Sequence, residues 1–306
     1  MHPNKSTTVR SYSKKVEGLG WAWPVLRAAT EVEARAADVA AWVSESLMFR
    51  TTRRTPPEAE QALLATGRRF RVPSAFGSLA GFRWGEGPVV LLVHGWNGRG
   101  AQLGGLVAPL VARGFEVVTF DGPGHGESPG ARSSLLEMAS AIEAVVDVIR
   151  PVGASLHAVV AHSMGAAATV VAAHRALGST ERTTREAGLF QRYAFVAPPI
   201  DVREFMRVFS EHARLRAPVV EALRRRVETR FATRLEDLYA PELARDFEAP
   251  LLVVHDALDK EVPLTTSQRL VAAWPGARLE VTEGLGHTRI LRDADVIERL
   301  ADFVAG

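Results

Sequence analysis

The sequence contains no cysteine, and this absence removes several kinds of site at once. Disulfide bonds, thiolate metal sites and a cysteine nucleophile are all excluded. The sequence also has no large excess of charge of one sign, because 37 lysines and arginines nearly balance 35 aspartates and glutamates, and the formal net charge is +2. Nucleic-acid binding needs a cluster of basic residues on one face, which this charge balance does not indicate, so we expect no nucleic-acid partner.

Long apolar runs are absent as well. The first residues, MHPNKSTTVRSYSKK, are polar and basic, and no apolar segment of roughly 7–15 residues follows them as it would in a secretory signal. The sequence has no uninterrupted run of about 18 apolar residues, which a membrane-spanning helix would need. We therefore expect a cytoplasmic protein without a membrane span.

The sequence also lacks the short motifs of cofactor and metal sites. No Gly-x-Gly-x-x-Gly follows an expected strand, and neither a phosphate-binding loop nor a His-Glu-x-x-His helix occurs. We expect no cofactor and no metal.

What is present is an apolar fraction of 47% in 306 residues, enough for one large core with an extension or insertion. Residues 1–66 are expected to form an N-terminal leader and helical extension. From residue 67, apolar runs such as PVVLLVHG alternate with helical patterns. This alternation predicts an α/β fold, a mostly parallel, doubly wound sheet covered by helices on both faces, over residues 67–200 and 249–306.

One block interrupts the alternation. Residues 201–248 show no strand pattern, carry many charges, and have prolines only at Pro218 and Pro241. We expect several helices inserted between two strands of the sheet, forming a cap or lid. A purely structural insertion is the alternative.

Polar side chains follow the predicted strands at the points where they end. Ser163 follows LHAVVAH, Asp256 and Asp259 follow LLVVH, and His287 lies in GLGHT after LEVTEG. Ligands of open parallel sheets bind beyond the carboxyl ends of the strands, so these groups are expected at one edge.

A hydroxyl, a carboxylate and an imidazole in this order have a known chemistry. A serine hydroxyl is a weak nucleophile until a neighbouring imidazole takes its proton, and a carboxylate then orients that imidazole. Ser163 could instead be a simple helix N-cap. Spacing favours Asp259 over Asp256 as the acid, which would leave Asp256 as a loop acid or helix cap.

Five motifs resemble those of the α/β-hydrolase superfamily, and the resemblance extends from about residue 85 to residue 306. AHSMG at 161–165 is similar to its nucleophile elbow, with Ala161 in place of the first glycine. HGW, DGPGHGES and GLGH also match. HDALDKEVP is similar to the family's H-G-x-x-D-x-x-V-P, with Asp256 where the family has glycine.

The resemblance implies roles for residues around the serine. The backbone N–H groups of Trp96 and Met164 would hold an oxyanion, and the side chains of Trp96 and His162 are expected beside the substrate. His94 is expected to shape the oxyanion loop and His125 a turn.

The resulting expectation is a serine hydrolase with the catalytic residues Ser163, Asp259 and His287, acting on a small or medium-sized carboxylic ester. Thioester hydrolysis, C–C hydrolysis and acyl transfer are alternatives on the same site, because one fold hosts many reactions. A ligand-binding receptor without turnover is another. The sequence indicates no oligomeric state.

Overall fold

The computed structural model describes residues 37–150, 155–178 and 188–306, together with Pro24. Most of the first 36 residues of the predicted leader and helical extension lie outside the described residues. The described chain forms two compact units, which are considered one at a time. One contains residues 37–50 and 201–239, and the other contains residues 51–200 and 240–306.

The larger unit is built on a sheet of eight strands in its described residues. The strands are β1 (Arg68–Ser74), β2 (Gly77–Trp84), β3 (Val89–Val93), β4 (Glu116–Phe120), β5 (Ala158–His162), β6 (Tyr193–Val196), β7 (Leu251–Asp256) and β8 (Arg278–Thr282). Their spatial order is β1-β2-β4-β3-β5-β6-β7-β8. β2 is antiparallel to both β1 and β4, and every other neighbouring pair is parallel.

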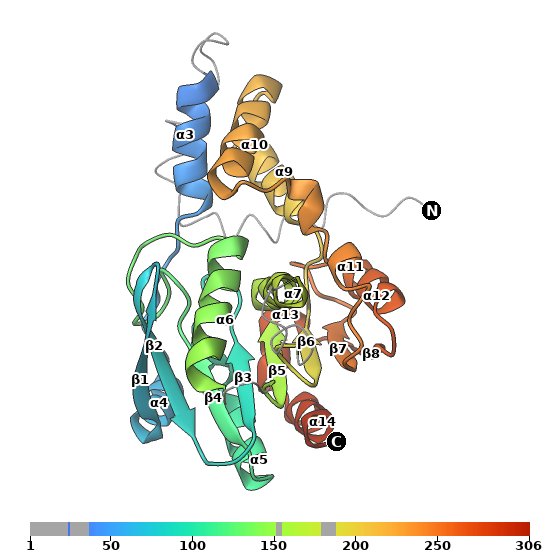
Figure 1. Cartoon of the computed structure of the whole chain (residues 1–306). Coiled ribbons are helices and arrows are strands. Elements are labelled where there is room, and N and C mark those ends of the chain that lie inside the picture. Colours follow the sequence, from blue (N-terminus) through green and yellow to red (C-terminus); the bar gives the residue numbers. More distant parts are fainter. Residues whose placement is uncertain (1–23, 25–36, 151–154, 179–187) are drawn as a thin grey trace. The chain divides into compact units, whose positions relative to one another are not determined.

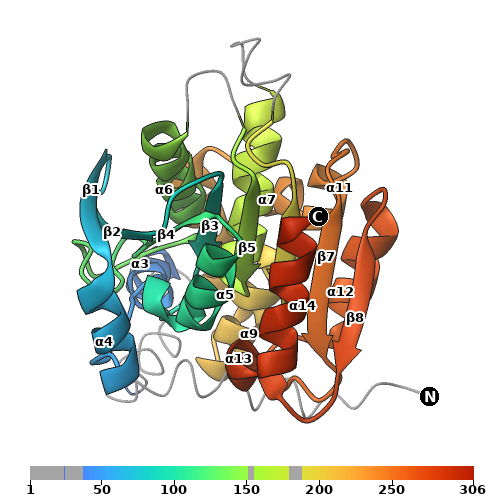
Figure 2. The same ribbon diagram turned by 90° about the horizontal axis from the view of Figure 1, so that it is seen from below.

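The central strands are apolar because helices cover both faces of the sheet. All five residues of β3 and of β5 are buried. On one face, Val90, Val160 and Val254 pack with apolar residues of α5 (Val107–Ala112) and α14 (Ala294–Ala305) in a single cluster. Figure 2 shows α5 and α14 on this side of the sheet, and α6 (Leu135–Ile149) and α7 (Met164–Leu177) on the other. The mostly parallel, doubly wound fold predicted from the sequence is confirmed.

The remaining helical elements of the larger unit are short. They are α4 (Glu58–Thr66), η3 (Gly100–Leu106), α11 (Ala240–Leu243), α12 (Leu264–Ala273), α13 (Gly286–Arg289) and η5 (Ile290–Arg292). η3 and α5 follow each other without a break, so residues 100–112 form a 3₁₀ segment that continues as an α-helix. Gly104 lies against the side chain of Leu63, where a Cβ atom would displace the leucine methyl, and glycine at this point weakens a regular helix.

The smaller unit is helical. It contains α3 (Ala37–Met48), α9 (Val202–His212), α10 (Ala217–Phe231) and η4 (Leu235–Leu238). α3 lies beside α10 (Figure 1), and their apolar faces form a core with Phe209 of α9. Glu45 is nearly buried and accepts hydrogen bonds of 3.0 Å from both Arg226 and Arg230, so its charge is compensated.

The segment that forms most of the smaller unit leaves the sheet after β6 and returns before β7. Its two ends meet in the larger unit, where the N–H of Ala240 donates to the carbonyl oxygen of Ile200 at 2.9 Å. The compact units therefore divide at residues 200/201 and 239/240, whereas the sequence places the end of the insertion at residue 248.

Candidate active site

Ser163 occupies a sharp turn between β5 and α7. Its backbone has φ 51° and ψ −127°, a conformation that side-chain-bearing residues rarely adopt. The turn is fixed by the Ser163 N–H, which donates to the carbonyl oxygen of Val196 on β6 at 2.9 Å. The hydroxyl makes no capping hydrogen bond to α7, so the helix-cap alternative finds no support in the contacts of Ser163.

Small residues around Ser163 allow this turn. A Cβ atom at Gly165 would collide with the carbonyl oxygen of His94 and lie 2.9 Å from that of Val93. A Cβ atom at Gly95 would lie 3.0 Å from the Cβ of Ser163. Glycine is therefore required at residue 165, and the loop that follows β3 passes directly beside the serine.

The structure brings Ser163, His287 and Asp259 together in a chain of hydrogen bonds. The Oγ of Ser163 lies 2.9 Å from the Nε2 of His287, and the Nδ1 of His287 lies 2.7 Å from the Oδ2 of Asp259. All three side chains are almost completely buried. Because the ionised Asp259 can only accept, Nδ1 carries the proton and Nε2 is left to accept from the serine hydroxyl.

Asp259 is held as a carboxylate by its partners. Burial opposes ionisation, but the hydrogen bond and charge of His287 and the N–H groups of Val262 and Glu261 outweigh it and lower the pKa of Asp259. Those two N–H groups donate to Oδ1 at 3.0 and 2.7 Å. The charge can therefore stabilise a protonated imidazole at His287.

Two neutral histidines brace the loop beside Ser163. The Gly122 N–H donates to Nε2 of His94 at 2.9 Å, and the Asn97 N–H donates to Nε2 of His125 at 3.1 Å. Both rings therefore carry the proton on Nδ1, where they donate to the carbonyl oxygens of Gly95 and Pro123. Burial lowers the pKa of His94 to about 4, and burial with the neighbouring His94 lowers that of His125 to about 3.

The predicted oxyanion donors lie on two different elements. Trp96 belongs to the loop that His94 and His125 brace, and its ring meets that of His125 edge to face at 5.9 Å. Met164 is the first residue of α7, where backbone N–H groups have no acceptor within the helix. Trp96 follows Gly95, which lies against Ser163, and Met164 follows Ser163 directly. An oxyanion formed by attack of Ser163 would develop beside both segments.

His162 contacts the backbone that carries the candidate base. Its Nε2 donates to the carbonyl oxygen of His287 at 2.9 Å, and the two rings are 4.7 Å apart. Its predicted contact with substrate remains a prediction, as does that of Trp96.

Two acidic residues near the site were not assigned a catalytic part by sequence reasoning. The described hydrogen bonds of Asp256 come from the backbone N–H groups of Leu258 and Leu285 and from the hydroxyl of Thr282, not from His287. The carboxylate of Glu261 lies 3.8 Å from Nε2 of His287. Only its place two residues after Asp259 could have pointed to Glu261.

The described residues contain no group of three or more His, Asp or Glu side chains arranged to hold a metal ion. Among the helices described here, none combines the length and apolar character that a membrane span requires.

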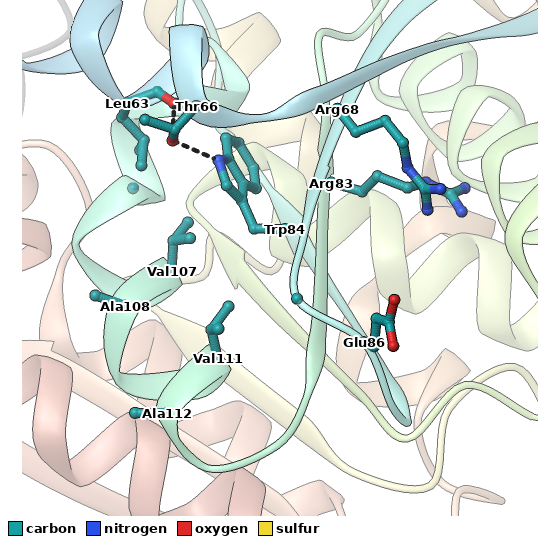
Figure 3. Close-up of a pocket in the computed structure, with 12 residues that line it drawn as sticks. Leu63, Thr66, Arg68, Arg83, Trp84, Glu86, Val107, Ala108, Val111 and Ala112 are labelled. Atoms are coloured by element: carbon teal, nitrogen blue, oxygen red, sulfur yellow. Dashed lines mark hydrogen bonds between the residues drawn. The ribbon is translucent and has the colours of Figure 1, made fainter.

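A pocket of about 760 Å³ lies away from these residues, where α4, α5 and the β2–β3 turn meet (Figure 3). Trp84 forms one wall and donates from Nε1 to Thr66 at 3.0 Å. Figure 3 shows Val107 and Val111 on the side of the indole, whereas Arg83 points away from them. The pocket is lined by none of the candidate catalytic residues.

Comparisons with known proteins show the family and the fold of the chain. A family model described as the alpha/beta hydrolase family matches residues 90–300, well over half of the chain. A curated relative, the pimeloyl-(acyl-carrier protein) methyl ester esterase of Methylococcus capsulatus, is 47% identical over 79 residues. That match spans 25% of this chain and only 31% of the relative.

Solved structures of esterases have the same fold. An esterase from Pyrococcus furiosus matches with a TM-score of 0.58 and 17% identity, covering 83% of this chain and 98% of that one. An esterase from Exiguobacterium antarcticum matches with a TM-score of 0.57 and 16% identity, covering 78% and 100%. At these identities the likeness shows the fold alone.

Proposed function

Because the chain belongs to the alpha/beta hydrolase family, we propose that it is a serine hydrolase that cleaves a carboxylic ester of small or medium size. The observation that carries the proposal is the hydrogen-bonded chain from Ser163 through His287 to Asp259, with contacts of 2.9 and 2.7 Å. The esterase activity of the partial relative supports an ester over the thioester, C–C and acyl-transfer alternatives.

In the proposed reaction, the Oγ of Ser163 attacks the ester carbonyl carbon while its proton passes to Nε2 of His287. Asp259 stabilises the imidazolium that forms, since its carboxylate already faces Nδ1. The N–H groups of Trp96 and Met164 hold the negative oxygen of the tetrahedral intermediate. The C–O bond to the alcohol then breaks, and the alcohol leaves with the proton from His287.

The second half of the reaction releases the acid. Water attacks the acyl group on Ser163 and gives its proton to His287, which returns that proton to the serine oxygen as the acyl bond breaks. The enzyme is regenerated, with one water consumed for each acid and alcohol produced.

We also propose that the helices of residues 201–248 form a lid that sets substrate choice. The block follows β6, whose last residue, Val196, accepts the hydrogen bond from the backbone of Ser163. An insertion at this point can supply side chains to the acyl pocket and limit the access of water to an acyl-enzyme.

A fluorophosphonate probe with peptide mapping tests the nucleophile. We expect labelling at Ser163, and loss of labelling in Ser163→Ala together with a fall in ester turnover on the order of 10⁴–10⁶-fold. The matched control is Ser134→Ala, which removes the cap of α6 and should leave labelling intact. Labelling of another serine, with activity kept in Ser163→Ala, would contradict the mechanism.

Turnover separates the enzyme from a receptor on the same scaffold. The wild-type protein should hydrolyse many equivalents of a short p-nitrophenyl ester, whereas a receptor would release about one equivalent or none. Product that forms only with an added alcohol would instead indicate acyl transfer.

A further inference from the structure

Asp256, the last residue of β7, has a fully buried carboxylate that is bound by two different loops. Its Oδ1 accepts from the N–H of Leu258 at 3.0 Å. Its Oδ2 accepts from the hydroxyl of Thr282 and from the N–H of Leu285, both at 2.9 Å. Leu258 precedes Asp259, and Leu285 lies two residues before His287.

The carboxylate therefore connects the segment that carries the candidate acid to the segment that carries the candidate base. These segments follow β7 and β8, which pair only as far as Asp256 and Thr282. Beyond that point the sheet no longer fixes their separation. One further backbone bond, from the N–H of Ala257 to the carbonyl oxygen of Thr282 at 2.8 Å, joins them at their base.

The contacts of Asp256 favour its charged form. Burial opposes ionisation, but hydrogen bonds from Leu285, Gly286, Thr282 and Leu258 outweigh it, so the pKa of Asp256 is lowered. Hydrogen bonds to a charged acceptor are roughly twice as strong as neutral ones, which makes this a stiff connection. A glycine at this position, as in the family motif, would have no side chain to make it.

We propose that Asp256 is a positioning residue that holds the two loops so that Asp259 and His287 meet at hydrogen-bond distance. This inference rests on the proposed esterase function, because its effect on catalysis is exerted through Asp259 and His287. Asp256 itself touches neither the serine nor the base through any of its described side-chain hydrogen bonds.

Asp256→Asn is the principal test. The asparagine amide is nearly the same size as the carboxylate. In either orientation, however, its NH₂ group faces a backbone N–H, that of Leu258 or that of Leu285, which in the wild type donates to a carboxylate oxygen. We expect kcat for a p-nitrophenyl ester to fall about 10- to 100-fold with KM within about twofold, because a shift of about 1 Å between reacting groups costs roughly 10²-fold. A role in stability alone would lower the amount of active enzyme and leave kcat per active site unchanged.

Thr282 gives a milder variant in case Asp256→Asn does not fold. Thr282→Val removes one hydrogen bond to Asp256 and keeps the shape, whereas Thr282→Ser keeps the hydroxyl and should restore kcat. In the Asp256→Asn background, Thr282→Val should cost less than it does alone, because both changes weaken the same connection between the two loops.

The matched control is Asp293→Asn. Asp293 caps α14 by accepting from the N–H of Val296 at 3.0 Å, so this variant also weakens a carboxylate–backbone bond. It should lower stability without lowering kcat. Equal losses of kcat in Asp293→Asn and Asp256→Asn would overturn the proposal.

A proton NMR measurement tests positioning without turnover. The Nδ1 proton of His287, shared with Asp259, should give a low-field resonance that is lost or moved upfield in Asp256→Asn and unchanged in Asp293→Asn. An unchanged resonance and kcat in Asp256→Asn would overturn the inference. If the wild-type protein shows this resonance and its dependence on Asp256 but no ester turnover, the proposed function fails and the positioning role stands.

Discussion

The two carboxylate oxygens of Asp259 have different partners. Oδ1 accepts from the backbone N–H groups of Glu261 and Val262, and Oδ2 faces Nδ1 of His287. Both oxygens must accept, so an amide in this place would put its NH₂ group against a donor whichever way it turned. The arrangement is specific for a carboxylate.

Asp259→Asn should therefore lower kcat by about 10⁴-fold, the loss that a wrong imidazole tautomer causes in the serine protease triad. Steady-state hydrolysis of a p-nitrophenyl ester measures it, and circular dichroism checks the fold. Asp147→Asn, at an exposed position on α6, should match the wild type. A loss smaller than that of Asp256→Asn would mean that the two aspartates have the opposite roles.

At the scale of single residues, the sequence allows candidate site residues to be identified where they lie near the ends of predicted strands. Ser163, Asp259 and His287 could be chosen because each lies within a few residues of the end of a predicted strand, and the edge of a parallel sheet gathers such positions. The connection made by Asp256 could not be predicted, because it depends on how two loops fold back beyond β7 and β8. The same reason hides Glu261, which approaches His287 only through the loop's conformation.

At the scale of elements, the loop after β3 and the glycine-rich loop after β4 are joined by histidines instead of by backbone pairing. His94 and His125 each accept from one loop N–H and donate to one carbonyl oxygen. A ring can do both only while it is neutral, so protonation would break the bracing of the loop that carries Trp96.

This arrangement predicts a loss of stability in acid. The pKa of His94 falls from 6.5 to about 4 on folding, and that of His125 to about 3, so below about pH 6.5 the unfolded chain binds protons that the folded protein does not. The free energy of unfolding should therefore decrease as the pH is lowered from about 6.5, by up to about 1.4 kcal/mol per pH unit for each histidine.

Urea unfolding between pH 6.5 and 5 measures this slope, in a range where most carboxylates remain ionised. His125→Gln should flatten it, because glutamine can accept from Asn97 but does not titrate. Leu103→Ala, a fully buried apolar control, should lower stability at every pH and keep the slope. An equal slope in His125→Gln and the wild type would refute the prediction.

At the scale of the whole molecule, the alternation of apolar runs predicts the parallel sheet, its helical cover and the interruption after β6. The order of the strands does not follow from the runs, because β4 pairs with β2 and β3 through contacts that are distant along the chain. The grouping of α3 with α9 and α10 was also not predicted, since it joins segments more than 150 residues apart.

The lid proposal makes a prediction about substrate choice. Phe205 of α9 packs on the core of the smaller unit but remains partly exposed, so its loss should alter a surface without unfolding the helices. We expect Phe205→Ala to change the ratio of kcat/KM between a short and a longer acyl ester by about threefold or more, with unchanged circular dichroism.

Arg207→Ala is the control for this change, because Arg207 lies on the same helix in an exposed ion-pair network with Glu204 and Glu211. It should leave the ratio unaltered. A complete set of alanine variants of the bulky residues in the block, all with the wild-type chain-length preference, would favour a purely structural insertion.

The hydrogen bond from Ala240 to the carbonyl oxygen of Ile200 closes the inserted segment at its base. A loop whose ends already touch can be lengthened, shortened or exchanged without altering the path of the strands on either side. The segment is therefore a natural unit of recombination. Under the lid proposal, a related chain could donate its own helices between these two residues and change the acyl preference, while Ser163, Asp259 and His287 kept their places.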